Sequence, residues 1–323
     1  MFMYDWCCKE IFSHVWLYCY GNGELDNMAR SKISDTLKNG KIMVSDGAWG
    51  TCLHANGLKP GECPELWCVE RPDDVRNVAK NYIDAGADMV ETDSFGGSSL
   101  MLEHFGLADR AAELNEAAAQ LSREAAGSDK WVIGSIGPTG RMLIMGDVSE
   151  EELYQSFKEQ AVAFEKGGSD AVCIETMSAI DEATLAVKAA KENTSLEIIC
   201  TFTFEKTAND EYRTMMGVSP TEMTKAMVAA GADIIGTNCG NGIEGMIDIV
   251  REIKAAAPNK PILVHANAGV PVLVDGHEVF PETPEFMASQ VPALIEVGAN
   301  IIGGCCGTTP AHIKAIKATI QKL

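Results

Sequence analysis

From Lys41 onward, short apolar runs alternate with segments in which apolar residues recur every three or four positions. The runs predict buried strands, and the periodic segments predict amphipathic helices. Strand candidates begin at 42–44, 88–90, 131–133, 171–174, 198–200, 234–235, 262–264 and 301–302. The clearest helices between them span 108–126, 150–166 and 180–192. Eight strands, each followed by a helix, predict a single α/β domain, the closed parallel (β/α)8 or TIM barrel.

A repeated triplet supports this count. It ends a helix and opens an apolar strand at 86–88, 168–170, 231–233 and 298–300. Glycine, the first residue each time, adopts the left-handed conformation that terminates a helix. The triplets precede the second, fourth, sixth and eighth strands, so the chain repeats a (βα)2 module. The alternative, a doubly wound open sheet, requires a phosphate-binding glycine fingerprint after the first strand, and the sequence has none.

Composition limits the possible partners and the location. The chain has 323 residues and a net charge of -20, with no basic stripe, which argues against a nucleic-acid partner. Its eleven cysteines follow no secretory leader, so we expect a reducing cytoplasm rather than a disulfide framework. No apolar run approaches the ~18 residues of a transmembrane helix, so we expect no membrane partner.

Residues 1–27 differ from the rest in being rich in aromatic residues and cysteine. We interpret them as an N-terminal extension of unknown role before a barrel domain over 28–323. Translation could start at Met28, or the extension could be an arm that binds a membrane surface or a partner.

Polar residues and cysteines follow the predicted strands. Because catalytic groups of a barrel come from the carboxyl ends of its strands, these residues are expected to share one face. They include Asp46, Glu91, Asp93, Glu175, Asn238, Cys239, Asn267, Cys305 and Cys306.

The cysteines give the strongest chemical signal. Cys239 follows the sixth strand, and the adjacent Cys305 and Cys306 follow the eighth, so their loops face the same mouth. Three thiolates make an open zinc site, one ligand short of a tetrahedron, where a thiol substrate could bind. Hydrolytic zinc sites favour histidine and carboxylate ligands. A site of three cysteines therefore indicates that the zinc ion activates a thiol substrate that accepts an alkyl group. The alternatives are buried structural cysteines, or a redox-active vicinal disulfide that leaves Cys239 unexplained.

Asp46, Glu91 and Glu175 are carboxylates at three strand ends. They could bind a substrate ammonium group through charge-assisted hydrogen bonds. They could equally be solvated acids or helix caps. Asn238 and Asn267 could orient the metal or the substrate, or simply form turns.

Other residues give weaker signals. The segment 137–140 could cradle an anion, but a strand-to-loop break is favoured. His265 is expected to pack in the seventh strand and His312 lies on the last helix, and neither has metal spacing. Four methionines near strand ends could contact a methyl donor, but gap filling is favoured: Met142, Met145, Met215 and Met216. Two further cysteines inside strands are expected to be core residues: Cys173 and Cys200.

Several segments together resemble a known family. They are 46–51 (DGAWGT), 91–95 (ETDSF), 137–139 (GPT), 174–176 (IET), 238–239 (NC), 267–269 (NAG) and 303–310 (GGCCGTTP). In this order, from about Ile42 to Ile313, they resemble the homocysteine S-methyltransferase family. Within it they are most similar to the homocysteine-binding barrel of cobalamin-dependent methionine synthases.

The resemblance implies that Cys239, Cys305 and Cys306 hold one zinc ion, which binds the homocysteine sulfur. It implies that Asp46 and Glu175 hold the ammonium group, with Glu91 lining the same pocket. Two positions depart from the synthase pattern. Asp93 replaces the usual asparagine and Ala266 the usual proline, which points to a different thiol or an altered grip on homocysteine.

We therefore expect a zinc-dependent homocysteine S-methyltransferase that forms methionine, with the zinc-bound thiolate attacking a methyl group on a separate donor. The favoured donor is a corrinoid protein that carries methylcobalamin. The alternatives are S-methylmethionine or betaine as donor, another thiol as acceptor, a non-catalytic partner of a corrinoid protein, and a zinc hydrolase or lyase.

Overall fold

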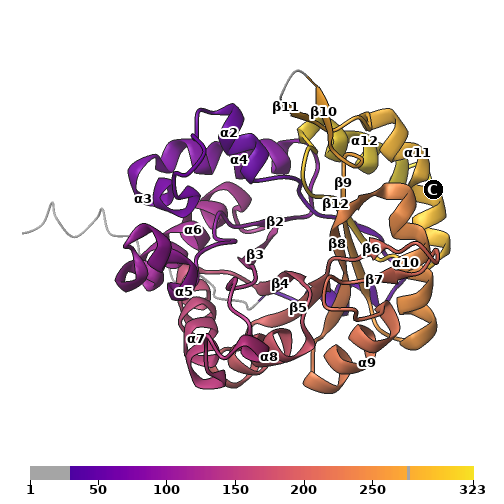
Figure 1. Ribbon diagram of the computed structural model, residues 1–323. Helices are drawn as coiled ribbons and strands as arrows, with labels where there is room; N and C mark the ends of the chain where they lie inside the picture. The colour runs from indigo at the N-terminus through magenta and orange to yellow at the C-terminus, as the bar shows by residue number, and fades with distance from the viewer. Residues whose placement is uncertain (1–29, 275–276) are drawn as a thin grey trace, which may run out of the picture. The chain divides into compact units, whose positions relative to one another are not determined.

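Eight parallel strands form a barrel surrounded by helices (Figure 1). The computed structural model describes residues 30–274 and 277–323. The barrel strands are β1 Met43–Val44, β2 Met89–Glu91, β3 Trp131–Ile136, β4 Ala171–Met177, β5 Glu197–Phe202, β8 Ile234–Gly242, β9 Ile262–Asn267 and β12 Ile301–Gly304. Their order is β1-β12-β9-β8-β5-β4-β3-β2, and every pairing is parallel. The TIM-barrel prediction and all eight predicted strands are confirmed.

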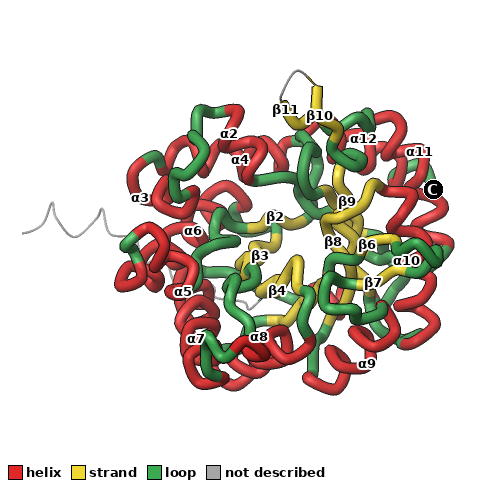
Figure 2. Tube along the Cα trace, viewed as in Figure 1, coloured by secondary structure: helices red, strands yellow, loops and turns green. Residues whose placement is uncertain are grey.

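A helix follows each strand on the outside of the barrel (Figure 2). These outer helices are α4 Pro72–Asp84, α6 Ala111–Ala126, α7 Glu150–Gly167, α8 Ile180–Asn193, α9 Pro220–Ala230, α10 Ile243–Ala256, α11 Pro284–Glu296 and α12 Pro310–Ile320. Short helices α2 Gly50–Ala55, α3 Trp67–Glu70 and α5 Ser99–Leu102 lie in the first two connections. Two hairpins that we did not predict, β6–β7 (Glu205–Lys206 and Tyr212–Arg213) and β10–β11 (Val272–Val274 and His277–Val279), lie in later connections.

The repeated triplet has a structural cause. Its four glycines have φ between 92° and 110°, the left-handed conformation expected after a helix. Each third residue then bonds twice to the preceding strand: its N–H donates to a carbonyl oxygen, and its side chain accepts that same residue's N–H. The pairs are Asp88 with Val44, Asp170 with Val132, Asp233 with Ile198 and Asn300 with Ile262. This device fixes the amino-terminal edge of the barrel four times.

The Asp88 pair also joins the first and second strands, which share no ladder. Val44 N donates to Asp88 Oδ2 at 2.9 Å, and Asp88 N donates to the Val44 carbonyl at 2.7 Å. At the other end of these strands, Glu91 N donates to Asp46 Oδ2 at 2.8 Å. One backbone bond and two bonds to aspartate side chains therefore join the strands where ladder pairing stops.

Two apolar layers stabilise the barrel. The larger lies between the strands and the outer helices, and the smaller fills the amino-terminal half of the barrel interior. Helix α1 (Ile33–Leu37) contributes Ile33 and Leu37 to the inner layer. The carboxylate of Glu197, the first residue of β5, accepts the N–H groups of Ile33 and Ser34 at 2.6 and 3.0 Å. The opposite, carboxyl-terminal half of the interior is left for polar residues.

The predicted extension over residues 1–27, and its boundary with the barrel domain, lie outside the described residues. Lys32–Leu323 forms one compact unit. Among the helices described, none combines the length and the hydrophobicity needed to cross a bilayer. The expected cytoplasmic location stays a prediction.

The fourfold device predicts that an amide can replace the acid. Asp233→Ala should lower the free energy of unfolding by about 1–2 kcal/mol, because the Ile198 N–H loses its acceptor. Asp233→Asn should cost less than about 0.5 kcal/mol, because Asn300 makes the same bond at the equivalent position. Urea unfolding followed by circular dichroism measures both. An equal loss in the two variants would show that the side-chain acceptor is not what matters.

Candidate active site

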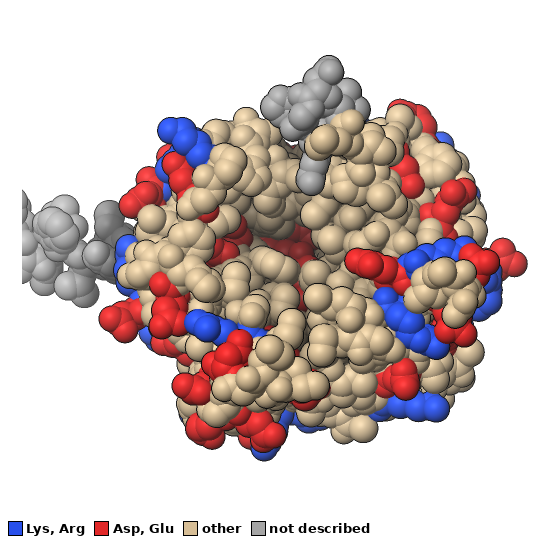
Figure 3. Space-filling view, viewed as in Figure 1, with Lys and Arg blue, Asp and Glu red and all other residues tan. Residues whose placement is uncertain are grey.

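The residues that follow the strands meet at one end of the barrel, around a cavity of about 400 Å³. Figure 3 shows acidic side chains at the base of this central hollow and mainly uncharged side chains around it. Six of the nine residues predicted to share this face line the cavity: Glu91, Asp93, Glu175, Cys239, Cys305 and Cys306. No lysine or arginine lines it. The cavity is therefore rich in thiols and carboxyl groups and lacks a fixed cation.

The three cysteines converge on one point. Their Sγ atoms lie within 4.8 Å of one another, and the Sγ atoms of Cys305 and Cys306 are 4.0 Å apart. Zinc–sulfur bonds of ~2.3 Å in a tetrahedron place two sulfurs about 3.8 Å apart. The group consists of cysteines alone. Its chemistry and spacing fit three of the four ligands of a tetrahedral zinc ion.

Backbone contacts with β9 hold the vicinal pair. Cys305 N donates to the Ala266 carbonyl at 2.7 Å, and Ala268 N donates to the Cys306 carbonyl at 2.9 Å. A Cβ atom on Gly303 would lie 2.7 Å from a carbonyl oxygen of the loop after β1. Only glycine therefore allows β12 to approach that loop.

Thr308 connects the same turn to the loop after β1. Its Oγ1 donates to the Cys305 carbonyl at 2.7 Å and accepts the Ala48 N–H at 3.0 Å. The first and the last connections of the barrel, more than 250 residues apart in sequence, are thereby fixed together at the cavity.

Cys239 reaches the cluster from a bulge in β8. The register of β8 against β9 shifts between Asn238 and Gly242, and Cys239 has a left-handed φ of 58°. Bulges re-aim a side chain in this way near functional sites. S–H donors from Cys305 and Cys306 lower the pKa of Cys239 well below its usual value.

Asp46 is buried beneath the loop after β1. Its carboxylate accepts hydrogen bonds from Ser45 Oγ at 3.0 Å, Trp49 Nε1 at 2.9 Å and Glu91 N at 2.8 Å. Burial raises its pKa to about 6 despite these donors. Asp46 therefore orders the loop and contributes negative potential below the cavity wall.

Glu175 and Glu91 face the cavity from β4 and β2. Glu175 accepts hydrogen bonds from Ser135 Oγ at 2.5 Å and Asn238 Nδ2 at 3.2 Å, and burial raises its pKa to about 7. Burial, together with the charges of Glu175 and Asp46, raises the pKa of Glu91 well above its usual value. The two glutamates therefore compete for protons.

Glu91 and His265 carry unused hydrogen-bonding atoms. Among the described residues, Glu91 Oε1 and His265 Nε2 are buried without a partner. His265 Nδ1 lies 3.7 Å from Glu91 Oε1, and burial lowers the pKa of the imidazole to about 4, so it is neutral at pH 7. His265 is packed in β9 as predicted, but it also lines the cavity. Buried unpaired polar atoms of this kind mark a place for a ligand or water.

Two asparagines support the cysteine side of the cavity. Asn267 contributes a side-chain hydrogen bond that lowers the pKa of Cys239, while its Oδ1 has no partner among the described residues. Asn238 is fully buried and bonded to protein groups.

The segment 137–140 does not offer an anion cradle. The N–H and hydroxyl of Thr139 both donate to Glu182 Oε1, at 2.8 and 2.7 Å. The chain's own carboxylate therefore fills the position that an external anion would need, and the strand-to-loop interpretation is the better one.

The gap-filling interpretation of the methionines is wrong, because Met145 and Met215 are more than 70% exposed.

Exposed apolar side chains lie on the connections that follow β2, β3, β5 and β9. They form what we call the apolar rim: Phe95, Phe105, Met142, Ile144, Met145, Met215, Met216, Val270, Val272, Leu273 and Val279. These residues make up most of the large apolar side chains that the described part of the chain exposes.

The sequence did not single out Glu65, Ser135 or Thr308. Glu65 lies on a short 3-10 helix before α3 and lines the cavity beside Asp93. Burial raises the pKa of Asp93 well above its usual value, and the Glu65 charge adds to the effect. Ser135 lies next to the segment 137–139, and Thr308 lies in the segment 303–310, which both carry the family resemblance. A search for hydroxyl donors near strand ends could therefore have found them. Nothing local marks Glu65.

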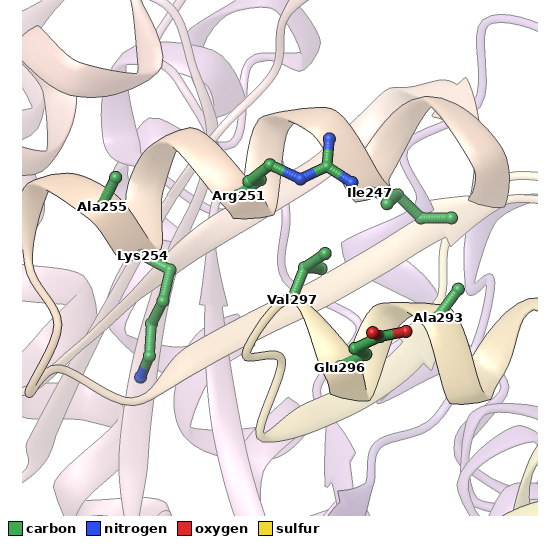
Figure 4. A pocket seen from close by; sticks show the side chains of 7 residues that line it. All are labelled: Ile247, Arg251, Lys254, Ala255, Ala293, Glu296 and Val297. Atoms are coloured by element: carbon green, nitrogen blue, oxygen red, sulfur yellow. The ribbon is translucent and has the colours of Figure 1, made fainter.

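A second hollow, of about 490 Å³, lies between α10 and α11 (Figure 4). Arg251, Lys254 and Glu296 line it, and Arg251 is paired with Asp248. It contains no cysteine and no buried carboxylate. This second hollow therefore does not hold the chemistry.

Comparison with known proteins identifies the fold and the family. The model of the homocysteine S-methyltransferase family matches residues 43–320. The metallated homocysteine methyltransferase MmuM from Escherichia coli superimposes with a TM-score of 0.71, covering 88% of this chain and 98% of that one, at 24% identity. This structural likeness shows a shared barrel.

Longer relatives also match. A methionine synthase of Mycobacterium tuberculosis is 31% identical over 301 residues, which is 88% of this chain and 25% of the relative. A methionine synthase of Mycobacterium leprae is 29% identical over 300 residues, 87% of this chain and 24% of the relative. The chain therefore spans about a quarter of the length of these relatives.

The buried acid Glu91 predicts a pH-dependent stability. A carboxyl whose pKa is raised by folding stabilises the fold below its unfolded pKa, and this contribution is lost as pH rises through the folded pKa. Glu91→Gln removes the buried charge, so in the metal-free, reduced protein it should raise the free energy of unfolding by about 1–3 kcal/mol at pH 8. At pH 4.5 the difference should be small.

Urea unfolding at both pH values measures this difference. The exposed Glu205→Gln is the matched control and should show no such pH dependence. A destabilised Glu91→Gln at pH 8 would mean that Glu91 has a cationic partner in the unliganded protein.

Proposed function

Because the chain belongs to the homocysteine S-methyltransferase family, we propose that it methylates the sulfur of homocysteine, forming methionine, at the cavity lined by Cys239, Cys305 and Cys306. One observation carries the proposal. Three sulfurs within 4.8 Å of one another open onto a cavity that also holds buried carboxylates and no fixed cation. An amino acid that bears a thiol and an ammonium group matches both the sulfur cluster and the buried carboxylates.

The three cysteines would hold one zinc ion. Zinc bound by three thiolates supplies a fourth position for a thiol and keeps that thiol deprotonated at neutral pH. Hydrogen bonds from the other two thiols lower the pKa of Cys239, which favours the thiolate that a zinc ligand requires. The absence of histidine and carboxylate from this group argues against a zinc hydrolase or lyase.

The carboxylates would bind the substrate ammonium. Glu91 Oε1 has an unused acceptor position, and Glu175 lies in the same buried group with His265. These three acceptors lie within 4.8 Å of one another. An ammonium nitrogen with three hydrogen bonds of ~2.9 Å places its acceptors about 4.7 Å apart. Asp46 supports the group through the Glu91 backbone.

Methyl transfer then requires an electrophilic methyl group in line with the sulfur. The sulfur lone pair forms the new carbon–sulfur bond, and the donor keeps the electron pair of the bond that breaks. The residues of this chain orient the acceptor and contribute no proton to it. The donor has to enter through the mouth of the barrel.

We propose a separate methyl-corrinoid protein as the donor. The apolar rim supports this proposal, because large exposed apolar patches on a soluble protein mark contact surfaces. The two mycobacterial relatives are methionine synthases, which agrees with methionine as the product. In this view the rim contacts the protein that presents methylcobalamin.

A small cationic donor is the second candidate. Glu65 and Asp93 line the same cavity as Phe95, Phe105 and Trp49. Carboxylates and aromatic faces together attract onium groups, such as those of S-methylmethionine or betaine. Asp93 would in that case also influence which thiol is accepted.

A donor screen tests the proposal. Zinc-loaded protein is incubated with homocysteine and each donor, and methionine is quantified. A non-catalytic partner subunit would bind the corrinoid protein without producing methionine, and a hydrolase or lyase would turn over homocysteine without a donor. Either result would overturn the proposed activity.

Removal of one sulfur should abolish activity but not folding. Cys306→Ser is expected to lose zinc, measured by inductively coupled plasma mass spectrometry, and to lower methyl transfer by about 100-fold or more. The circular dichroism spectrum should stay native, because Cys306 is partly exposed and outside the apolar core. Cys52→Ser is the control, since Cys52 contacts Tyr82 rather than the cluster. Full activity in Cys306→Ser would rule out the metal centre.

A charge on the rim should distinguish the donors. Ile144 is 78% exposed, so Ile144→Glu should leave folding and calorimetric homocysteine binding unchanged. With a methyl-corrinoid protein, kcat/KM should fall about tenfold, because a charge is buried in the contact. Val228→Glu, on α9 outside the rim, is the matched control. An unchanged rate in Ile144→Glu would favour the small donor.

A further inference from the structure

Asn238 uses its whole side-chain amide inside the protein. Its exposed fraction is 0%. Oδ1 accepts the Thr176 N–H at 2.8 Å and the Thr201 hydroxyl at 2.7 Å. Nδ2 donates to Thr176 Oγ1 at 2.7 Å and to Glu175 Oε2 at 3.2 Å. An asparagine amide has two donors and two acceptor positions, so none remains for a substrate.

The bonds connect two irregular places in the barrel. The register of β4 against β5 shifts between Ile174 and Met177, and that of β8 against β9 shifts between Asn238 and Gly242. Each bulge contains a non-glycine residue with φ of 58°: Thr176 in β4 and Cys239 in β8. In the described part of the chain, Asp210 is the one further non-glycine residue with positive φ.

Such conformations need external support. A left-handed β-branched residue such as Thr176 is disfavoured, and the typical cost is about 1–3 kcal/mol. The bulge also removes the Thr176 N–H from the strand ladder, and the Asn238 oxygen accepts it. β5 lies between β4 and β8 in the sheet. The Asn238 side chain therefore crosses β5, where Thr201 fixes it, to reach β4.

We propose that Asn238 is a positioning residue that sets the metal ligand Cys239 and the ammonium-binding carboxylate Glu175 together. The inference rests on the proposed function, because it needs those two roles. Asn238 fixes the backbone immediately before the left-handed Cys239 and holds one carboxylate oxygen of Glu175. One amide therefore sets the relation between the sulfur site and the ammonium site, and so the length of amino acid that spans them.

Asn238→Asp tests the proposal with the same side-chain shape. Aspartate keeps both acceptor positions but loses both donors, and it places a second carboxylate against Glu175. Zinc affinity, measured by chelator competition, should fall about 10- to 100-fold. The affinity of the zinc-free protein for 2-aminobutyrate, an amino acid without sulfur, should also fall at least about tenfold by calorimetry. With saturating zinc, KM for homocysteine should rise more than kcat falls.

Variants at the sulfur site or at the ammonium site should separate the effect on zinc binding from the effect on 2-aminobutyrate binding. Cys306→Ser should lose zinc and retain 2-aminobutyrate binding. Glu91→Gln should weaken 2-aminobutyrate binding and retain zinc. Asn238→Asp should do both, because its bonds reach both sites.

Asn115→Asp is the control for a merely structural role of a buried asparagine. Asn115 is also 0% exposed, and its amide bonds to Gly97, Ala111 and Gln160 between the outer elements. This variant should lose stability without a change in either affinity. If Asn238→Asp does not fold, Thr201→Val removes one bond to Oδ1 without altering charge. It should shift both affinities in the same direction by about two- to fivefold.

The proposal is overturned if the folded Asn238→Asp, or Thr201→Val in its place, retains both affinities within twofold, or if only one of them changes. These readouts need no methyl donor. A failed donor screen with two coupled affinities would therefore reject the proposed reaction and leave the role of Asn238 standing. A successful donor screen, with zinc and 2-aminobutyrate affinities that do not change together, would reject the role of Asn238 and leave the proposed reaction standing.

Discussion

The convergence of three thiol sulfurs at the carboxyl end of a closed parallel barrel is the constraint on which the site depends. Parallel strands deliver every following loop to the same end, so residues 239 and 305–306 meet although more than sixty positions separate them. The meeting also requires local devices: a bulge that turns Cys239 inward, and a glycine that lets β12 approach the first loop. Without the closed ring the sulfurs would have no common position.

The same end of the barrel concentrates negative charge. Asp46, Glu91 and Glu175 are buried there, and no lysine or arginine lines the cavity. Burying a charged group is costly, which is why the pKa values of these carboxyls rise. A metal ion and a substrate ammonium would each relieve part of this cost. Binding affinity at the cavity is thus linked to instability of the unliganded site.

The two ends of the barrel divide stability from function. At the amino end, four aspartate or asparagine side chains repeat one hydrogen-bonding device, and α1 contributes to the apolar layer inside the barrel. At the carboxyl end, the strands become irregular, with left-handed residues at Thr176 and Cys239. Strain of this kind persists only where the surrounding structure enforces it. The regular end provides that rigidity, and the apolar rim around the irregular end provides a surface that another protein could contact.

The fold and the family could both be predicted from the amino-acid sequence alone. The alternation of strands and helices, the repeated triplet and the order of the motifs each depend on local patterns. Such patterns can be recognised in the sequence without knowledge of tertiary contacts. The spacing of Asp46, Glu91, Glu175 and the cysteines after strands also placed them on one face. Which polar atoms remain free depends on the folded chain: Asn238 is saturated, Glu91 and His265 have unused atoms, and Glu182 occupies the position proposed for an anion. Hydrogen-bond partners and burial depend on residues far apart in sequence, such as the distant Glu65 beside Asp93, and no local pattern encodes them.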